Sequence, residues 1–396
     1  MKFAHFADCH LGSWRENKLQ ELSLNTFRKA IDYCLKEYVG FVLISGDLFD
    51  TALPSIELIK EVAHELNRFK EQDIPVYIIA GSHDFSTSGK TMLDVLEKAG
   101  LVDNVVKLKD NKLEFTEDRT GTLITGLYGK RGSLEIEDYK TLNIKDLEEN
   151  AKLENNFKIF MFHTALTEFK GEEFERVESA SYAVLPKYFD YYAGGHVHYI
   201  YEADKSSEGY GKIVYPGPLF PNNFAELEKL RQGGFYIVEV KDKNISMNHI
   251  PLELVKLESY NINVDDKTPD EVTKEIYKIK NTQDKLILIR IEGSLKSGKP
   301  SDIKFNDIFA KFEEPFFVLK NTNKLTAKEF EEIEVKQGTV EEIESHIIEN
   351  SDKHELFNKE FISKIMDVLN LEKNEDEKIP DFESRLLKDV KRMMGV

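Results

Sequence analysis

The sequence contains almost no cysteine and no long apolar run. Only Cys9 and Cys34 occur among 396 residues, too few for a disulfide framework and too isolated for a structural zinc site, which favours a reducing compartment. No uninterrupted apolar stretch approaches the roughly 20 residues that a membrane-spanning helix needs. Residues 1–5 lead directly into a strand pattern rather than a cleavable leader. We therefore expect a cytoplasmic protein without a membrane partner.

Basic residues are outnumbered by acidic ones. The chain carries 54 Lys and Arg against 72 Asp and Glu, a formal net charge of -18. Neutralising phosphates requires clustered Lys and Arg, so this balance excludes a protein that coats nucleic acid by its overall charge, and any nucleic-acid contact must be local. The acidity fits a site that gathers divalent cations, although solubility is its simplest explanation.

The amino-terminal part of the chain alternates between strand and helix patterns. Apolar strand patterns at residues 2–8, 41–47 and 76–80 are separated by helical spacing at residues 17–38 and 54–69. This alternation predicts right-handed crossovers and a largely parallel sheet, so the carboxyl ends of the strands meet at one edge. With this length and 41% apolar residues, the chain is long enough for two or three domains.

Chemically active side chains follow each of these strands. Asp8-Cys9-His10 ends the first, and in an extended segment the residues i and i+2 point the same way, so the two side chains can ligate one ion. Asp47 and Asp50 follow the second strand, and residues 81–84 (Gly-Ser-His-Asp) follow the third. The topology therefore predicts that these groups converge.

Two later strand patterns end in histidine. Residues 157–162 run into His163, and residues 189–195 run through paired glycines into His196-Val197-His198. Each piece alone has an ordinary structural explanation, because Asp and His adjoin in many loops and a single strand-final histidine is usually a satisfied core residue. Five such pieces, each closing a strand, indicate a metal site with carboxylate and imidazole ligands.

One motif imitates a phosphate-binding P-loop. Ser88-Gly89-Lys90-Thr91 lies between a strand and a helix pattern, but the position that needs the first glycine is Asp84, whose carboxylate would face the phosphates. A turn into a helix at residues 91–99 explains the segment without ATP.

Together these motifs make residues 1–240 resemble the calcineurin-like metallophosphoesterase superfamily, an α/β fold with two packed sheets. Residues 7–12 and 45–50, and residues 215–217 before residues 234–236, most resemble its branch of DNA double-strand-break repair nucleases, the Mre-eleven and SbcD type. The resemblance implies a metal-dependent phosphodiesterase that acts on DNA.

The resemblance also implies roles for the site residues. One metal ion would be held by Asp8, His10, Asp47 and His198, and the second by Asp47, His163 and His196, with Ser82 as a further candidate ligand. Such ligands suit Mn²⁺, Fe²⁺ or Zn²⁺, and the nuclease activity of the family points to two Mn²⁺ ions, which polarise a phosphodiester and lower the pKa of an attacking water. His83 would donate a proton to the leaving oxygen, since an unperturbed histidine pKa of about 6.5 allows both protonation states near neutral pH. Asp84 would orient the His83 ring.

Two residues depart from the family pattern. Ser82 stands where the family usually has a metal-binding Asn, which leaves three possibilities: the hydroxyl is a ligand, a water takes its place, or the second ion binds more weakly. Asp50 stands where archaeal and eukaryotic relatives often carry a second histidine near the substrate phosphate, although bacterial members can have Asp. We therefore count Asp50 among the catalytic residues, with His83 and Asp84.

The remainder of the chain is predicted to form a smaller domain and a tail. Residues 241–325 show alternating strand and helix patterns, with Thr268 and Pro269 at a helix start, and resemble in size and position an α+β capping domain that orients DNA. Lys296, Lys299 and Lys304 can contact phosphates there, although solvated lysines are the simpler interpretation.

Residues 326–396 contain short amphipathic helical patterns separated by charged linkers. Such helices either fold onto the body or dock on a partner, and the sequence does not decide between these. In the resembled family they bind the coiled-coil base of an SMC-like ATPase of the Rad-fifty or SbcC type. Ile362, Ile365, Val368 and Leu369 share one helical face and are the expected contacts.

We therefore predict a Mn²⁺-dependent nuclease that acts with this ATPase in double-strand-break repair, as a homodimer associated with the nucleoid. It would be a 3′ to 5′ exonuclease on duplex DNA and an endonuclease on single strands. A generic phosphodiesterase or phosphatase for small molecules is the enzymatic alternative, and the capping region and tail argue against it. A metal-poor scaffold is the third hypothesis, which Ser82 makes conceivable and the full set of Asp and His ligands opposes.

Overall fold

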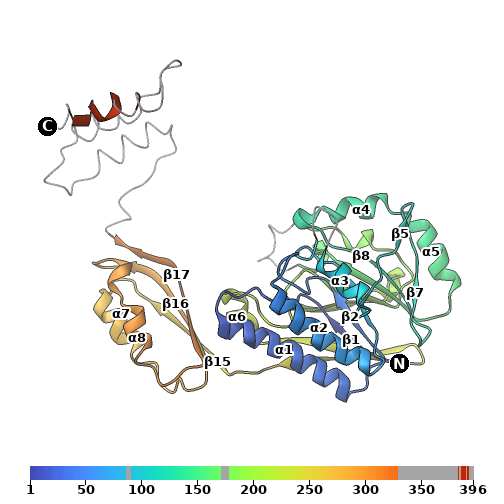
Figure 1. The fold of residues 1–396 in the computed structure, drawn as a ribbon, viewed down its shortest axis with the longest axis horizontal. Coiled ribbons are helices and arrows are strands. Elements are labelled where there is room, and N and C mark those ends of the chain that lie inside the picture. Colours follow the sequence, from blue (N-terminus) through green and yellow to red (C-terminus); the bar gives the residue numbers. More distant parts are fainter. Residues whose placement is uncertain (86–90, 171–177, 329–381, 383–384, 389, 392–396) are drawn as a thin grey trace. The chain divides into compact units, whose positions relative to one another are not determined.

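The computed structural model describes residues 1–85, 91–170 and 178–328, together with 382, 385–388 and 390–391 (Figure 1). Contacts divide these residues into two units: those within 1–260, 281–289 and 312–321 form the first, and those within 261–280, 290–311 and 322–396 the second. The expected contact residues Ile362, Ile365, Val368 and Leu369 lie outside the described residues. None of the helices within the described part has the length and apolar character needed to cross a membrane.

The first unit contains a six-stranded sheet in the order β14-β13-β1-β2-β3-β4. Its strands are β1 (Lys2–Phe6), β2 (Phe41–Ser45), β3 (Val76–Ile79), β4 (Asp103–Asn104), β13 (Gly233–Lys241) and β14 (Asn244–Leu252). Strands β1 to β4 are parallel, whereas β13 is antiparallel to both β1 and β14. The connecting helices are α1 (Asn17–Lys36), α2 (Ile56–Glu71) and α3 (Met92–Lys98). The predicted parallel arrangement of the first three strands is confirmed.

A second six-stranded sheet has the order β11-β12-β10-β9-β8-β7. Its strands are β7 (Thr116–Glu117), β8 (Leu123–Leu127), β9 (Lys158–His163), β10 (Tyr191–Gly195), β11 (Ile200–Asp204) and β12 (Lys212–Pro216). The inner strands β8, β9, β10 and β12 are parallel, and β7 and β11 are antiparallel at the edges. A short hairpin, β5 (Leu108–Lys109) with β6 (Lys112–Leu113), and helices α4 (Glu135–Thr141), α5 (Ile144–Leu153) and α6 (Phe224–Leu230) complete the unit.

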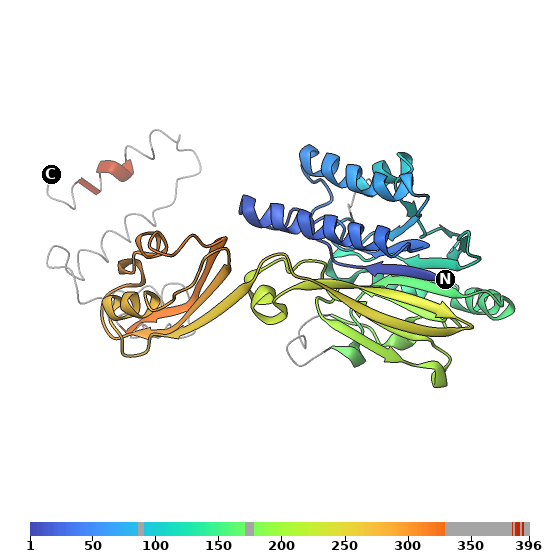
Figure 2. The same ribbon diagram turned by 90° about the horizontal axis from the view of Figure 1, so that it is seen from below.

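The two sheets pack face to face between layers of helices (Figure 2). Successive side chains of a strand point to opposite faces of its sheet. One face of each sheet therefore packs against the other sheet, and the opposite face packs against helices. In β2, Leu43 lies in the core between the sheets, together with Ile159 and Met161 of the second sheet. Val42 and Ile44 face the other way, into a core that also contains residues of α1, α2 and α3. The outer face of the second sheet packs against α4 and α5. The predicted two-sheet α/β fold is confirmed.

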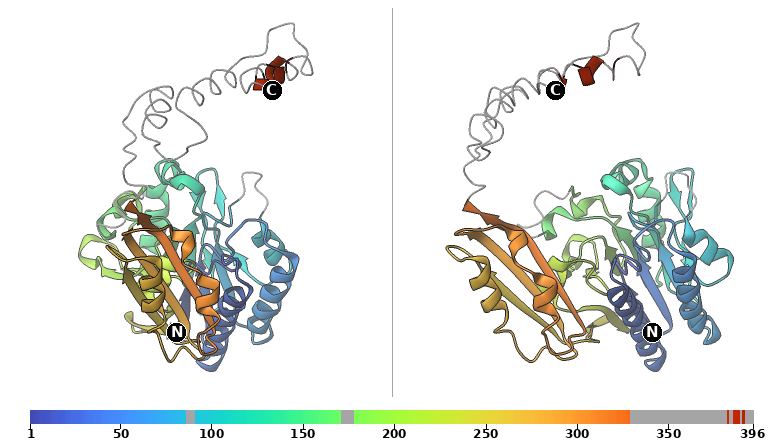
Figure 3. Two further views of the ribbon diagram at one scale, coloured as in Figure 1. Left: turned by 90° about the vertical axis from the view of Figure 1, so that its left-hand side faces the viewer. Right: turned by 60° about the vertical axis from the view of Figure 1, so that its left-hand side comes forward.

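A three-stranded sheet follows, in the order β15-β16-β17 (Figure 3). Its strands are β15 (Leu257–Asn263), β16 (Leu286–Leu295) and β17 (Phe317–Ala327), accompanied by α7 (Pro269–Ile276) and α8 (Phe305–Phe309). Helix α7 begins as predicted, with Thr268 accepting a hydrogen bond from the Glu271 N–H and Glu271 bonding back in a capping box. The strands and helices of this α+β part alternate as the sequence predicts, but they begin at Leu257 and not at residue 241, because residues 241–252 belong to the first sheet.

Several boundaries differ from the sequence patterns. Helix α2 begins at Ile56 with Ser55 as its N-cap, so Pro54 precedes the helix instead of starting it. Strands β16 and β17 run to Leu295 and Ala327, past the apolar runs at residues 286–291 and 315–319 that predict these strands. The hairpin of β13 and β14 continues the first sheet to Leu252.

Candidate metal centre

The candidate site lies where strands from both sheets end. Asp8 and His10 follow β1, Asp47 follows β2, and residues 82–84 follow β3. His163 is the last residue of β9, and His196 and His198 follow β10. The convergence predicted for Asp8, His10, Asp47 and His83 is confirmed by the contacts among them.

Main-chain hydrogen bonds join the loops that carry these residues. The Asp8 N–H donates to the Gly46 carbonyl (3.2 Å), and the His10 N–H donates to the Asp47 carbonyl (2.9 Å). Asp8, His10, Asp47 and His196 all have positive φ, at 49°, 42°, 51° and 90°. Such backbone is uncommon outside glycine and concentrates at functional sites. The extended conformation that we expected for Asp8 and His10 is therefore wrong, and the left-handed turns bring them together instead.

Two glycines allow the loops to approach His163. Gly46 has a φ of +88°, and a Cβ there would lie 2.2 Å from His163 Nδ1. A Cβ on Gly195 would lie 2.0 Å from the Ser45 carbonyl oxygen. Only glycine leaves room for both contacts.

Potential ligand atoms form three overlapping clusters within the described residues. Atoms within 4.8 Å of one another come from Asp8 with His10 and His198, from Asp8 with Asp47 and His163, and from His10 with Asp50 and His83. Asp47 Oδ2 lies 3.6 Å from His10 Nε2 and 3.1 Å from His163 Nε2. A carboxylate between two histidines is the arrangement expected of a bridging ligand.

Several buried nitrogen and oxygen atoms of these clusters are placed as the ligands of a metal ion would be. Nε2 of His10 and of His198 are 3.1 Å apart, and Asp8 Oδ2 and His163 Nε2 are buried without a hydrogen-bond partner. The 3.1 Å approach of His163 Nε2 to Asp47 is thus not a well-aligned hydrogen bond. Buried polar atoms without a partner are costly, and a bound cation would give these atoms one. The donor set fits transition-metal dications.

Three of the histidines direct their other ring nitrogen away from the cluster. Nδ1 of His10 lies 3.1 Å from the Asp50 carboxylate, Nδ1 of His163 lies 2.8 Å from the Ser45 carbonyl oxygen, and Nδ1 of His198 lies 2.9 Å from Glu226. Metal-binding histidines normally donate their distal N–H to such oxygens, which orients the ring.

The buried charges are strongly coupled. Burial raises the pKa of Asp47, but the neighbouring histidines, His163 above all, together outweigh burial and hold that pKa well below its usual range. Burial lowers the pKa of His163, and Asp47 and Asp8 reverse this and raise it to about 10. Burial raises the pKa of Asp8. These carboxylates therefore require positive charge beside them, which protonated His163 or bound cations supply.

Asp84 does not orient the His83 ring as we predicted. Its buried carboxylate accepts hydrogen bonds from the N–H groups of Leu48 (3.2 Å), Phe49 (3.1 Å) and Gly81 (3.1 Å), and so holds the loops after β2 and β3 together. Burial, followed by the negative charge of Asp47, raises the Asp84 pKa to about 6. The partner of the His83 ring is Asp50.

His83 Nδ1 lies 2.7 Å from the carbonyl oxygen of Asp50 and 3.5 Å from its carboxylate. The His83 backbone N–H donates to Asp47 Oδ1 (2.7 Å), and its ring meets that of His10 edge to face. Because a carbonyl oxygen only accepts, Nδ1 carries a proton and Nε2 is the nitrogen available for chemistry. The His83 side chain is 41% exposed, so substrate can reach it.

Ser82 and His196 lie beside the clusters. The Ser82 hydroxyl donates to Asp47 Oδ2 (3.2 Å). The His196 ring contacts that of His163, and its backbone N–H donates to Asp8 Oδ1 (2.8 Å). His196 is outside the three clusters of ligand atoms identified in the described residues. Its predicted role as a ligand, like that of Ser82, stays a prediction.

Sequence reasoning missed Glu226. Its carboxylate is the partner of His198 Nδ1. Burial lowers the His198 pKa, but this hydrogen bond, together with the negative charges of Asp8, Glu226 and Asp47, raises it to about 8. The spacing Asn223-x-x-Glu226 is a helix-start signal. That signal predicts helix α6 but not its contact with a histidine 28 residues earlier.

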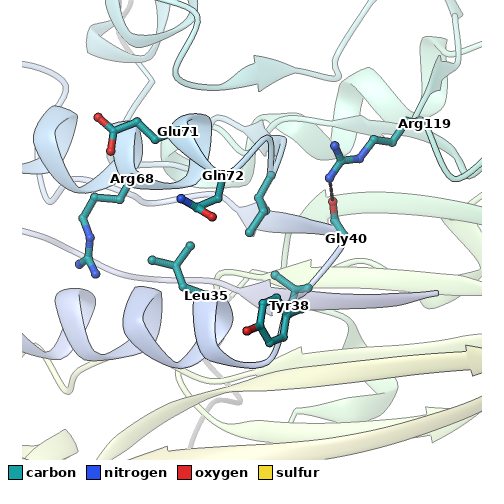
Figure 4. Close-up of a pocket in the computed structure, with 9 residues that line it drawn as sticks. Leu35, Tyr38, Gly40, Arg68, Glu71, Gln72 and Arg119 are labelled. Atoms are coloured by element: carbon teal, nitrogen blue, oxygen red, sulfur yellow. Dashed lines mark hydrogen bonds between the residues drawn. The ribbon is translucent and has the colours of Figure 1, made fainter.

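A cavity of about 440 Å³ lies at the other end of the parallel strands (Figure 4). Its lining includes Gly40 and Ile74, which precede β2 and β3. Arg68 there is paired with Asp32 and Glu65. The cavity is thus separate from the strand ends that carry the metal-binding candidates.

Comparison with known proteins agrees with this geometry. The family model described as calcineurin-like phosphoesterase matches residues 1–199. The chain is 27% identical to the DNA double-strand break repair protein Mre11 of Archaeoglobus fulgidus, over 95% of this chain and 82% of that protein. It is 25% identical to the Mre11 protein of Sulfolobus acidocaldarius, over 96% of each chain, and 26% identical to that of Methanococcus maripaludis, over 89% of this chain and 91% of that protein. The chain belongs to the calcineurin-like phosphoesterase family and is a metal-dependent phosphodiesterase.

Proposed function

We propose that this chain is a Mn²⁺-dependent DNA nuclease of double-strand-break repair, a 3′ to 5′ exonuclease on duplex DNA and an endonuclease on single strands. The observation that carries the proposal is the cluster of Asp8, His10, Asp47, His163 and His198, with the exposed His83 ring beside it. The substrate class is supported by the names of relatives aligned along 95% and 96% of the chain.

Two Mn²⁺ ions held by these Asp and His residues would polarise the phosphodiester and activate the attacking water. The residues themselves have distinct tasks. Asp47 lies between His10 and His163 and would be shared by both ions, with Ser82 and His196 as further candidates for the second. The main-chain bonds between the β1 and β2 loops fix the ligands before substrate arrives.

His83 is suited to protonate the leaving oxygen. Asp50 accepts the Nδ1 proton, which leaves Nε2 on the exposed side of the ring. The Asp50 carboxylate, 3.1 Å from His10 Nδ1 and 3.5 Å from His83 Nδ1, links a metal ligand to the proton donor. Asp84 contributes indirectly by holding the two loops.

The proposed partners are DNA, a second copy of the chain and an SMC-like ATPase, which would place the protein at the nucleoid. The ATPase is supported by the amphipathic spacing in residues 326–396 and by alignments that cover 95% or more of the chain. Residues 241–325 would cap the DNA. A homodimer is supported by three exposed apolar side chains: Leu53 in the loop before α2, Ile56 at the start of α2 and Val95 on α3, which are 77%, 79% and 53% exposed.

The test is release of labelled nucleotides from the 3′ ends of linear duplex DNA in Mn²⁺. We expect release by the wild type, loss of at least about a hundredfold in His83→Ala, and unchanged release in His64→Ala, which alters an exposed histidine on α2. Hydrolysis of a small phosphodiester by the wild type without DNA cleavage contradicts the DNA assignment. Equal rates for His83→Ala and wild type contradict the proton-donor role.

A further inference from the structure

Glu226 is held in one place by several donors. It lies in the first turn of α6, where Asn223 caps its backbone N–H (3.0 Å). The Asn222 N–H donates to Glu226 Oε2 (3.0 Å), and the Asn223 side-chain amide donates to Oε1 (2.6 Å). The carboxylate therefore cannot rotate without breaking hydrogen bonds.

Helix α6 is itself anchored in the first unit. Leu227, the residue after Glu226, is 1% exposed and packs in a cluster with Trp14, Phe220 and Leu257. The Trp14 indole N–H donates to the Pro221 carbonyl (3.0 Å), which fixes the loop that leads into the helix. Burial on one side and capping on the other give Glu226 a rigid support.

The contact with His198 determines which ring nitrogen faces the candidate metal centre. An ionised carboxylate only accepts, so the 2.9 Å bond from His198 Nδ1 to Glu226 Oε1 places the proton on Nδ1. The Nε2 lone pair then points toward His10 Nε2, 3.1 Å away, and Asp8 Oδ1, 3.9 Å away. Of the two neutral forms of the ring, only this one presents a lone pair at the centre.

We propose that Glu226 is a positioning residue that sets the tautomer and orientation of His198 for metal binding. The inference rests on the proposed metal-dependent function, but it concerns a residue outside the part matched by the family model. It predicts that the affinity of the centre depends on a carboxylate that touches no ion itself.

Glu226→Gln is the discriminating variant. Both carboxylate oxygens accept hydrogen bonds, Oε1 from His198 and Asn223 and Oε2 from Asn222. The glutamine NH₂ group must take the place of one of these oxygens. It then faces a hydrogen-bond donor: His198 and Asn223 if it replaces Oε1, or the Asn222 N–H if it replaces Oε2. Glu228→Gln is the matched control, since Glu228 lies on the same helix and contacts Ser259.

The first measurement is calorimetric titration of the full chain with Mn²⁺ alone, without DNA. We expect Glu226→Gln to weaken binding by about 10- to 100-fold at the site that contains His198, and Glu228→Gln to change it less than twofold. Thermal unfolding in EDTA checks that both variants remain folded. Wild-type affinity in folded Glu226→Gln would overturn the inference, whereas failure of the wild type to bind Mn²⁺ would overturn the proposed function itself.

The second measurement reads the tautomer directly. The metal-free chain, labelled with ¹⁵N-histidine, is studied by NMR at a pH where the ring is neutral, and His198→Gln identifies the resonances. We expect the proton on Nδ1 in the wild type and a shift of population toward Nε2–H in Glu226→Gln. A wild-type proton on Nε2 would refute the proposal, because that form presents no lone pair to a metal.

Discussion

His5 is a buried histidine whose neutral form is favoured in the folded first unit. Its ring lies between the two sheets, with Nδ1 2.9 Å from the Tyr191 hydroxyl and Nε2 3.0 Å from the Ser45 hydroxyl. Burial lowers its pKa to about 3, against about 6.5 in an unfolded chain. Between these pH values the unfolded chain binds a proton that the folded chain does not. The free energy of unfolding therefore falls as the pH decreases below about 6.5.

The size of this effect follows from the two pKa values. Each pH unit in that interval removes about 1.4 kcal/mol, so a change from pH 7.5 to 5.0 removes about 2 kcal/mol through His5 alone. Urea unfolding in EDTA, followed by Trp14 fluorescence, measures it. Trp14 is the single tryptophan and is buried in the first unit, so its signal reports on that unit. His5→Gln keeps a donor and an acceptor but cannot titrate.

Comparing the wild type with His5→Gln isolates the contribution of His5 to the pH dependence of the free energy of unfolding. Other buried histidines also respond to pH, such as His196, whose pKa burial lowers to about 3, but they are present in both proteins. We expect the wild type to lose about 2 kcal/mol more than His5→Gln between pH 7.5 and 5.0. Equal losses would show that His5 gains no proton on unfolding in this range, and would refute the reasoning.

Three further predictions concern the site and the dimer. Ser82→Asn places an amide oxygen near the second proposed ion and should raise Mn²⁺ affinity by about tenfold in calorimetry; unchanged affinity would mean that this position contacts no ion. Gly46→Ala forces a Cβ to within 2.2 Å of His163 Nδ1 at a φ of +88°. It should lower the free energy of unfolding by roughly 2 kcal/mol or more and abolish metal binding, and a stable, metal-binding variant would contradict the described packing. Leu53→Ser with Ile56→Ser should shift sedimentation from dimer to monomer, and an unchanged dimer would place the interface elsewhere.

Much of the site was predictable because its parts are local. An apolar run followed by Gly46-Asp47 or by residues 81–84 identifies a strand end from neighbouring residues alone. Parallel crossovers then bring strand ends together whatever the detailed packing. This reasoning correctly predicts that Asp47, His83 and the residues after β1 lie close together.

The errors arose where long-range contacts decide the outcome. The backbone of Asp8 and His10 is set by hydrogen bonds to the loop after β2, so the assumption of an extended segment failed. Asp84 adjoins His83 in sequence but turns toward three backbone N–H groups. The contact of Glu226 with His198 joins residues that are 28 positions apart in the sequence, and no local pattern predicts such a contact.

The hydrogen bonds that join the β1 and β2 loops run from main chain to main chain. They are therefore independent of the side chains at Cys9, Leu48 and the other positions between the ligands. Cys9 and Leu48 are buried in the core, so replacements there that preserve the apolar packing leave these hydrogen bonds in place, provided that the glycine at position 46 is kept. A centre built in this way can persist through extensive sequence divergence, because main-chain hydrogen bonds hold the loops that carry its ligands.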